Sequence, residues 1–269
     1  MKLYKISLVI IMILGIIFIG TSQPIKNLYK NSASIITGLK IDDNKKNPAD
    51  NKEVNKKEKV EKYLICIDPG HQEKGDWRTE PVGPGAPYQK ARVSSGTVGI
   101  STKKPEYILN LEASQVLKHI LISKGYEVIM TRDSHNVNIS NMERATFANN
   151  KNANMVIRIH ADGSDDTSIT GASMLNQKQK GKYTSSIFEA SYQCANLVKA
   201  KMDSAGFKVN GIFERDDLTG FNWSTVPVIL VEMGFMSNYN EDEMMSNAQY
   251  QRKMMQSIAD GVDEYFQIN

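Results

Sequence analysis

The chain has 269 residues, which is enough for one large domain with an extension or for two small domains. Its net charge of +3 is spread along the chain, and 41% of its residues are hydrophobic, as is ordinary for a globular protein. Nucleic-acid-binding proteins usually concentrate basic residues on one face, so this composition argues against a nucleic-acid partner.

The first residues have the features of a targeting signal. Lys2 and Lys5 precede an uninterrupted apolar run over residues 8–19. That run is shorter than the roughly 20 residues that a transmembrane helix needs, and its length is typical of a signal-peptide core. No A-x-A cleavage site follows it, so an uncleaved membrane anchor remains an alternative. We therefore predict that residues 1–22 are a signal peptide or anchor and that the protein is exported.

Residues 23–62 are predicted to be a charged, flexible tether. From residue 40 onward, Lys, Glu, Asp and Asn dominate this segment, and large apolar side chains are nearly absent. Such a composition buries too little surface to offset the entropy of ordering the chain. No internal repeat occurs anywhere in the chain, so no tandem binding modules are expected.

The folded domain is predicted over residues 63–269, where short apolar segments alternate with helical patterns. Strands are expected at residues 64–67, 127–130, 155–159, 171–175 and 226–231, and helices at residues 105–124, from 140, 185–205 and 247–266. The stretch over residues 72–104 is polar and rich in Gly and Pro, which is typical of a long loop. Alternating strands and helices predict a single α/β domain with helices on both faces of a central sheet.

Unusual polar residues follow three of the predicted strands. The first strand runs into His71, the third ends at His160, and the last ends at Glu232. Ligand sites in open α/β sheets lie beyond the carboxyl ends of the strands, so these side chains are predicted to converge if the strands are parallel neighbours. Glu106 begins the first long helix, whose N-terminus is expected at the same edge.

Two imidazoles and a carboxylate are a common ligand set for catalytic zinc. A second carboxylate that does not bind the metal can move protons during hydrolysis. We therefore predict that His71, His160 and Glu106 are the metal ligands and that Glu232 is the acid/base residue. A carboxylate after an apolar strand such as that of Glu232 is expected to be paired or functional, because burying a lone charge is costly.

The assignment of Glu106 has alternatives at this stage. A first-turn acid can simply complement the helix dipole. The preceding loop also holds the rival carboxylates Glu73, Asp76 and Glu80.

The remaining histidines and the cysteines are predicted to stay outside the site. His119 lies beside the apolar face of the first long helix and is expected to be structural, and His135 is expected to be solvated in a loop. Cys66 and Cys194 lie in apolar patterns far apart and are expected to be buried free thiols.

At these positions the sequence resembles the zinc-dependent N-acetylmuramoyl-L-alanine amidase family of bacterial autolysins and sporulation amidases. The resemblance covers nearly all of residues 63–269. It is based on six motifs in the family's order: IDPGH at residues 67–71, EYILNL at 106–111, the strand ending in Thr131 and Arg132, Arg144 with residues 148–149, RIHAD at 158–162, and the segment over 227–238.

The resemblance implies that His71, Glu106 and His160 bind one zinc ion per chain and that Glu232 is the catalytic residue. It also implies a mixed, mostly parallel sheet. The implied substrate is peptidoglycan, cut at the amide between the lactyl group of N-acetylmuramic acid and L-alanine of the stem peptide. The protein would then act in the cell wall or at the outer face of the membrane, to which an uncleaved N-terminal segment would hold it.

The sequence departs from the family pattern in two places. Arg158 and Asp162 stand where the family usually has Ser and Asn around the second histidine, which predicts altered packing or substrate contacts. The first histidine is followed by Gln, Glu and Lys in place of glycines, and residues 72–104 form a longer stretch than in many members. This stretch is either a loop over the cleft or a passive surface excursion.

Two alternative functions must be distinguished from that of an amidase. A zinc carboxypeptidase or deacetylase would act on another bond in the wall, although Lys74 stands where an HxxE motif at His71 would need an acid. A non-catalytic, membrane-tethered protein that binds or regulates the wall would carry a decayed site, whereas here the set of four is intact. The lack of repeats predicts targeting by the N-terminal segment or by an activating partner protein.

Overall fold

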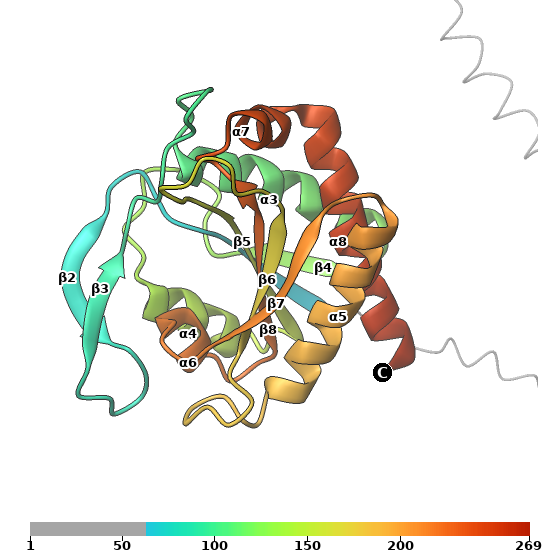
Figure 1. Cartoon of the computed structure of the whole chain (residues 1–269). Helices are drawn as coiled ribbons and strands as arrows, with labels where there is room; N and C mark the ends of the chain where they lie inside the picture. The colour runs from blue at the N-terminus through green and yellow to red at the C-terminus, as the bar shows by residue number, and fades with distance from the viewer. Residues whose placement is uncertain (1–62) are drawn as a thin grey trace, which may run out of the picture. The chain divides into compact units, whose positions relative to one another are not determined.

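Six strands form the central sheet of the described part of the chain, residues 63–269, in this computed structural model (Figure 1). Their order in the sheet is β4 (Glu127–Met130), β1 (Leu64–Pro69), β5 (Met155–Asp162), β8 (Val228–Phe235), β6 (Ala172–Gln177) and β7 (Val209–Arg215). The first four strands are parallel, β6 is antiparallel to β8, and β7 is parallel to β6. The predicted mixed, mostly parallel sheet is therefore confirmed. The segments predicted over residues 1–22 and 23–62 lie outside the described residues.

Helices cover both faces of the sheet, as predicted (Figure 1). One face packs against α3 (Glu106–Ser123), α5 (Phe188–Ser204) and α8 (Ala248–Ile268). The other face packs against α4 (Asn141–Asn150) and the short α6 (Thr219–Asn222), while α7 (Tyr239–Ser246) follows β8.

Alternation along the strands explains this division. Ile65, Ile67 and Ile157 belong to the cluster under α3, α5 and α8, whereas Cys66 and Val156 belong to the cluster under α4 and α6. Successive side chains in a strand point to opposite faces, so an uninterrupted apolar run is buried on both sides.

The stretch predicted as a long loop contains a hairpin. Strands β2 (Asp76–Pro81) and β3 (Gln89–Val93) pair in antiparallel fashion and form a separate two-stranded sheet. The hairpin is fastened to the domain, because the indole N–H of Trp223 donates to the carbonyl of Pro81 at 2.8 Å and Arg92 pairs with Glu143 at 2.8 Å. Strand β7 was also not predicted.

The starts of two helices follow the sequence signals. Pro105 is the N-cap residue of α3, so Glu106 is its first helical residue. Ser140 and Glu143 form the predicted capping box at α4, in which each side chain accepts a hydrogen bond from the other residue's backbone N–H. Among the helices of residues 63–269, none combines the length and apolar character needed to cross a bilayer.

Both cysteines are buried free thiols, as predicted. Burial raises the pKa of Cys194 to about 12, so its thiol stays protonated at neutral pH.

Candidate active site and metal centre

The carboxyl ends of three neighbouring strands bring the candidate residues together. Strands β1, β5 and β8 are adjacent and parallel. His71 follows β1, whereas His160 on β5 and Glu232 on β8 stand opposite each other in the strand register. Glu106 reaches the same edge from the start of α3, so all four predicted residues lie at one place.

Three of these residues form a group that fits a metal ion. One ligand atom from each of His71, Glu106 and His160 lies within 4.8 Å of the others. The Oε1 atom of Glu106 is 3.1 Å from Nε2 of His71 and 3.3 Å from Nδ1 of His160. The rival carboxylates Glu73, Asp76 and Glu80 are not in this group.

The carboxylate of Glu106 is buried and held by several donors. Its Oε2 accepts a hydrogen bond from the backbone N–H of Thr97 at 3.0 Å, and its Oε1 accepts from Asn110 Nδ2 at 3.0 Å and from the backbone N–H of Ala161 at 3.2 Å. Burial alone would raise the pKa of Glu106, but hydrogen bonds with His160 and His71 hold it below its usual range. The group is therefore an oriented anion, as a metal ligand must be.

The imidazole of His71 is held by the loop after the hairpin. Its Nδ1 lies 3.0 Å from the backbone carbonyl of Ser94 and 2.9 Å from the Ser94 hydroxyl. A carbonyl oxygen can only accept, so Nδ1 carries a proton and donates it to Ser94, while Nε2 faces Glu106. The backbone of His71 has a φ of 61°, a left-handed conformation, and Arg144 Nη2 donates to its carbonyl at 2.9 Å. Ser94 gave no signal in the sequence, because it contacts the site from an irregular loop.

His160 carries an unpaired ring nitrogen. Its Nε2 is buried and has no hydrogen-bond partner among the described residues. Burial lowers the pKa of His160 to about 4, so the ring is neutral at pH 7 and can donate a lone pair. Gly70 lies directly against this ring, and a Cβ atom at that position would overlap it.

Glu232 stands beside the group without belonging to it. Its Oε2 is buried and has no partner among the described residues. Burial raises the pKa of Glu232 well above its usual range, and the nearby charges of Glu106 and Asp162 add to that effect. A carboxylate with a raised pKa is a better proton acceptor and donor near neutral pH than an exposed one.

A pocket of about 620 Å³ opens above these four side chains. The rest of its lining comes from Thr97 before α3, from the end of β5 and the loop after it, and from Ser237 after β8; the residues around the end of β5 are Ala161, Asp162, Gly163, Ser164 and Asp165. The pocket is therefore built at the carboxyl ends of the strands, where the sequence predicted it.

A buried ion cluster lies under the first histidine. The carboxylate of Asp68 accepts from Arg144 Nη1 and from Arg158 Nε, each at 2.8 Å, and from the hydroxyl of Thr131. Arg132 is next to it and donates to the carbonyls of the turn that leads to the histidine. Arg158, one of the two departures from the family pattern, thus packs against a buried acid.

The two remaining histidines lie outside the site, although their surroundings differ from those predicted. His119 is exposed on α3, and its Nδ1 lies 2.6 Å from the carbonyl of Gln115. His135 is half-buried and meets the ring of Tyr107 edge-on, with centroids 5.4 Å apart. The sequence placed His135 in a loop, but it gave no sign of the contact with Tyr107.

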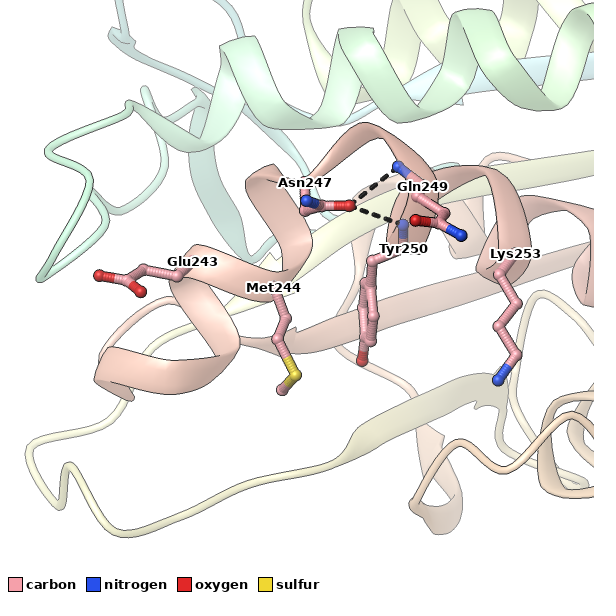
Figure 2. A pocket seen from close by; sticks show the side chains of 6 residues that line it. All are labelled: Glu243, Met244, Asn247, Gln249, Tyr250 and Lys253. Carbon is pink, nitrogen blue, oxygen red and sulfur yellow. Dashed lines mark hydrogen bonds between the residues drawn. The ribbon is translucent and has the colours of Figure 1, made fainter.

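A second hollow of about 510 Å³ lies at the junction of α7 and α8 (Figure 2). The side chain of Asn247 caps α8 there by accepting from the backbone N–H groups of Gln249 and Tyr250. None of the residues of this hollow lines the pocket at the strand ends, and it offers no histidine or buried acid. It therefore does not belong to the candidate site.

Comparison with known proteins agrees with this geometry. The family profile described as N-acetylmuramoyl-L-alanine amidase matches residues 65–264. The chain is 29% identical over 214 residues to the N-acetylmuramoyl-L-alanine amidase Rv3717 of Mycobacterium tuberculosis, an alignment that covers 74% of this chain and 84% of the relative. It is 25% identical to the probable cell wall amidase LytH of Staphylococcus epidermidis, over 75% of this chain and 58% of the relative.

A solved structure shares the fold. The apo form of the N-acetylmuramyl-L-alanine amidase Ami1 from Mycobacterium abscessus superimposes with a TM-score of 0.69 at 25% sequence identity. The match covers 76% of this chain and 98% of that one. The described domain therefore shares its fold with that structure.

Proposed function

Because the chain belongs to the N-acetylmuramoyl-L-alanine amidase family, we propose that it is a peptidoglycan hydrolase. The bond cut would be the amide between the lactyl group of N-acetylmuramic acid and L-alanine of the stem peptide. The observation that carries the proposal is the group of His71, Glu106 and His160, with Glu232 beside it.

We propose that this group holds one zinc ion. Two imidazole nitrogens and one carboxylate are the donor set of many catalytic zinc sites, which leave a further position open. The donors present fit such an ion: His71 Nε2 and Glu106 Oε1 lie 3.1 Å apart, and His160 is neutral with a buried nitrogen that has no partner in the described domain. Zinc bound there would supply Lewis acidity, which acidifies water and polarises the scissile carbonyl.

The side chains of the protein have separate tasks in the proposed reaction. Glu232 accepts a proton from the attacking water and returns it to the nitrogen of L-alanine as the C–N bond breaks. Its raised pKa makes it a stronger proton acceptor than an exposed carboxylate. Asn110 and the backbone N–H of Thr97 keep Glu106 in one orientation, and Ser94 does the same for His71.

We further propose that the protein works outside the cytoplasm. The support is the signal-like apolar run in residues 1–22 and the naming of the staphylococcal relative as a cell wall amidase. Residues 23–62 would then join this segment to the catalytic domain at 63–269. Targeting to the wall would come from an uncleaved N-terminal segment or from a partner protein, and the biological setting, such as growth or sporulation, stays open.

The proposal can be tested by incubating the full chain with purified peptidoglycan and following the appearance of N-terminal alanine. We expect release that stops with a chelator and returns with zinc. Release of acetate, or of C-terminal amino acids alone, would instead assign the site to a deacetylase or a carboxypeptidase. Absence of any product, with zinc bound, would favour the non-catalytic wall-binding protein.

A further inference from the structure

Two cavities share His71, His160 and Glu232 in their linings, and the charged residues that line the rest of each cavity are of opposite sign. The 620 Å³ pocket continues past Asp162 and Asp165, and no Lys or Arg of the described residues lines it. A narrower cleft of about 250 Å³ extends toward the hairpin and is lined by Lys90, Arg158 and Arg215. The only acidic residue in the lining of this cleft is the proposed acid/base glutamate. We call it the cationic cleft.

Arg215 is positioned in the cleft by a neighbouring carboxylate. Its Nε and Nη2 atoms donate to Asp217 at 2.7 and 2.9 Å. The ammonium group of Lys90, from β3 of the hairpin, donates to the same carboxylate at 3.2 Å and to the Asp217 carbonyl at 2.7 Å. One carboxylate thus holds two cations, which leaves one positive charge in excess.

The pairing with Asp217 does not occupy every N–H group of the Arg215 guanidinium. Its Nη1 group has no hydrogen-bond partner in residues 63–269, and the side chain is about half exposed, at 42%. Arg158 differs, because its guanidinium is buried and already engaged by Asp68 and Asn141. Arg215, with Lys90 beside it, therefore supplies the available positive charge.

The two sides of the scissile amide also differ in charge. On the sugar side, the lactyl carboxyl group is consumed in the amide, so that side offers hydroxyl and acetamido groups. On the peptide side, the stem carries free carboxylates. Guanidinium and ammonium groups are the protein's strongest donors to carboxylates.

We propose that the cationic cleft is the subsite for the stem peptide and that Arg215, assisted by Lys90, binds a stem carboxylate. This inference rests on the proposed amidase function and adds the direction in which the substrate lies. The peptide leaves the site toward the hairpin, and the sugar lies over the acidic pocket. The hairpin is then a wall of the substrate site, which resolves the choice between a cleft loop and a passive excursion.

The test compares two forms of one substrate. Purified peptidoglycan is used as isolated and after its carboxyl groups have been activated with a water-soluble carbodiimide and converted to methylamides with excess methylamine. Initial rates of N-terminal alanine release are measured at low substrate for the wild type, Arg215→Gln, Lys90→Gln and the double variant. Arg252→Gln on α8 and Lys199→Gln on α5 remove the same charges far from the cleft and serve as matched controls.

The readout is the ratio of the two rates for each protein. Arg215 lies near Glu232, so its loss could also change proton transfer, but that effect applies to both substrates and cancels in the ratio. We expect the wild type and both controls to prefer the free acid at least tenfold, Lys90→Gln to prefer it less, and Arg215→Gln and the double variant to be close to indifferent.

Each outcome is decisive. If the wild type cuts both substrates equally, or if Arg215→Gln keeps the wild-type ratio, the cleft is a structural ion-pair set and the inference is wrong while the amidase function stands. If the controls lose the preference as well, general attraction between a basic protein and an acidic wall is the cause, and the inference is again wrong. No release from untreated peptidoglycan by the wild type would contradict the proposed function itself.

Discussion

Two polar clusters lie at the same end of the sheet, and they differ in how well their atoms are paired. In the Asp68 cluster, both carboxylate oxygens accept hydrogen bonds, and Arg144 and Arg158 provide opposing charge. In the catalytic cluster, by contrast, His160 Nε2 and Glu232 Oε2 are buried without a partner in the described residues.

This difference in pairing distinguishes a cluster with a structural role from a cluster with a proposed role in catalysis. A buried polar group without a partner lowers stability, and one that faces a pocket is available to a ligand or an ion that supplies the missing partner. The paired cluster fixes the turn that carries His71, and the unpaired one is where we propose that a metal and a substrate bind. Substitutions in the two clusters should therefore affect different quantities.

The largest effect is expected from Glu232→Gln. Loss of the proton carrier should slow release of N-terminal alanine by about 10²- to 10⁴-fold. Stability in urea should hardly fall, because the replaced carboxylate has an unpaired oxygen. Zinc content should also be retained.

Glu189→Gln, at an exposed first-turn acid of α5, is the matched control and should behave as the wild type in all three assays. A Glu232→Gln protein that retains more than a tenth of the wild-type rate would remove Glu232 from the reaction.

Asp68→Asn should produce the reverse pattern. Removing one partner of a buried ion cluster leaves Arg144 and Arg158 uncompensated, and we expect a loss of about 3–5 kcal/mol in the free energy of unfolding at pH 7. Urea denaturation measures it. The exposed pair partner Asp203→Asn should lose less than about 0.5 kcal/mol.

The same substitution has a pH signature. Burial alone would raise the pKa of Asp68, but Arg144 and Arg158 hold it below its usual range. A lowered pKa in the folded state stabilises the protein above the unfolded value of about 4, and this contribution disappears as the pH falls below that value. The gap in stability between the wild type and Asp68→Asn should therefore narrow below about pH 4, and a gap that widened there would contradict the assignment.

A smaller effect is expected at Asn110, which contacts one of the proposed metal ligands. Asn110 donates to Glu106 Oε1 and, at 3.3 Å, to the carbonyl of Gly70. Asn110→Ala should weaken zinc binding by about 10- to 100-fold, as is usual when an outer-shell partner is lost. Competition with a chromogenic chelator measures this affinity, and Gln115→Ala, one turn and a half further along α3, should leave it unchanged.

Much of the site could be predicted because buried parallel strands leave a strong pattern. Apolar runs that end in His71, His160 and Glu232 indicate both the strands and the edge where they meet. Strand β7 could not be found in this way, because it lies at the sheet edge, is largely exposed and contains Gly211 at a φ of 150°.

The individual contacts that irregular loops make with the site could not be predicted from the sequence either. Ser94 and Thr97 reach the site through backbone and hydroxyl atoms, and their residue types carry no periodic signal. The pairing of Arg158 with Asp68 joins residues 90 positions apart, so only the altered packing, not its partner, could be expected from the sequence.

The central claim is that His71, Glu106 and His160 hold one zinc ion, and equilibrium dialysis against zinc tests it most directly. The bound metal is counted for the wild type, His71→Ala, His160→Ala and the control His119→Gln, whose histidine lies exposed on α3. We expect about one zinc per chain in the wild type and the control, and none in the other two at the same free concentration. A wild type that binds no zinc, or a His160→Ala variant that binds it as tightly, would contradict the account.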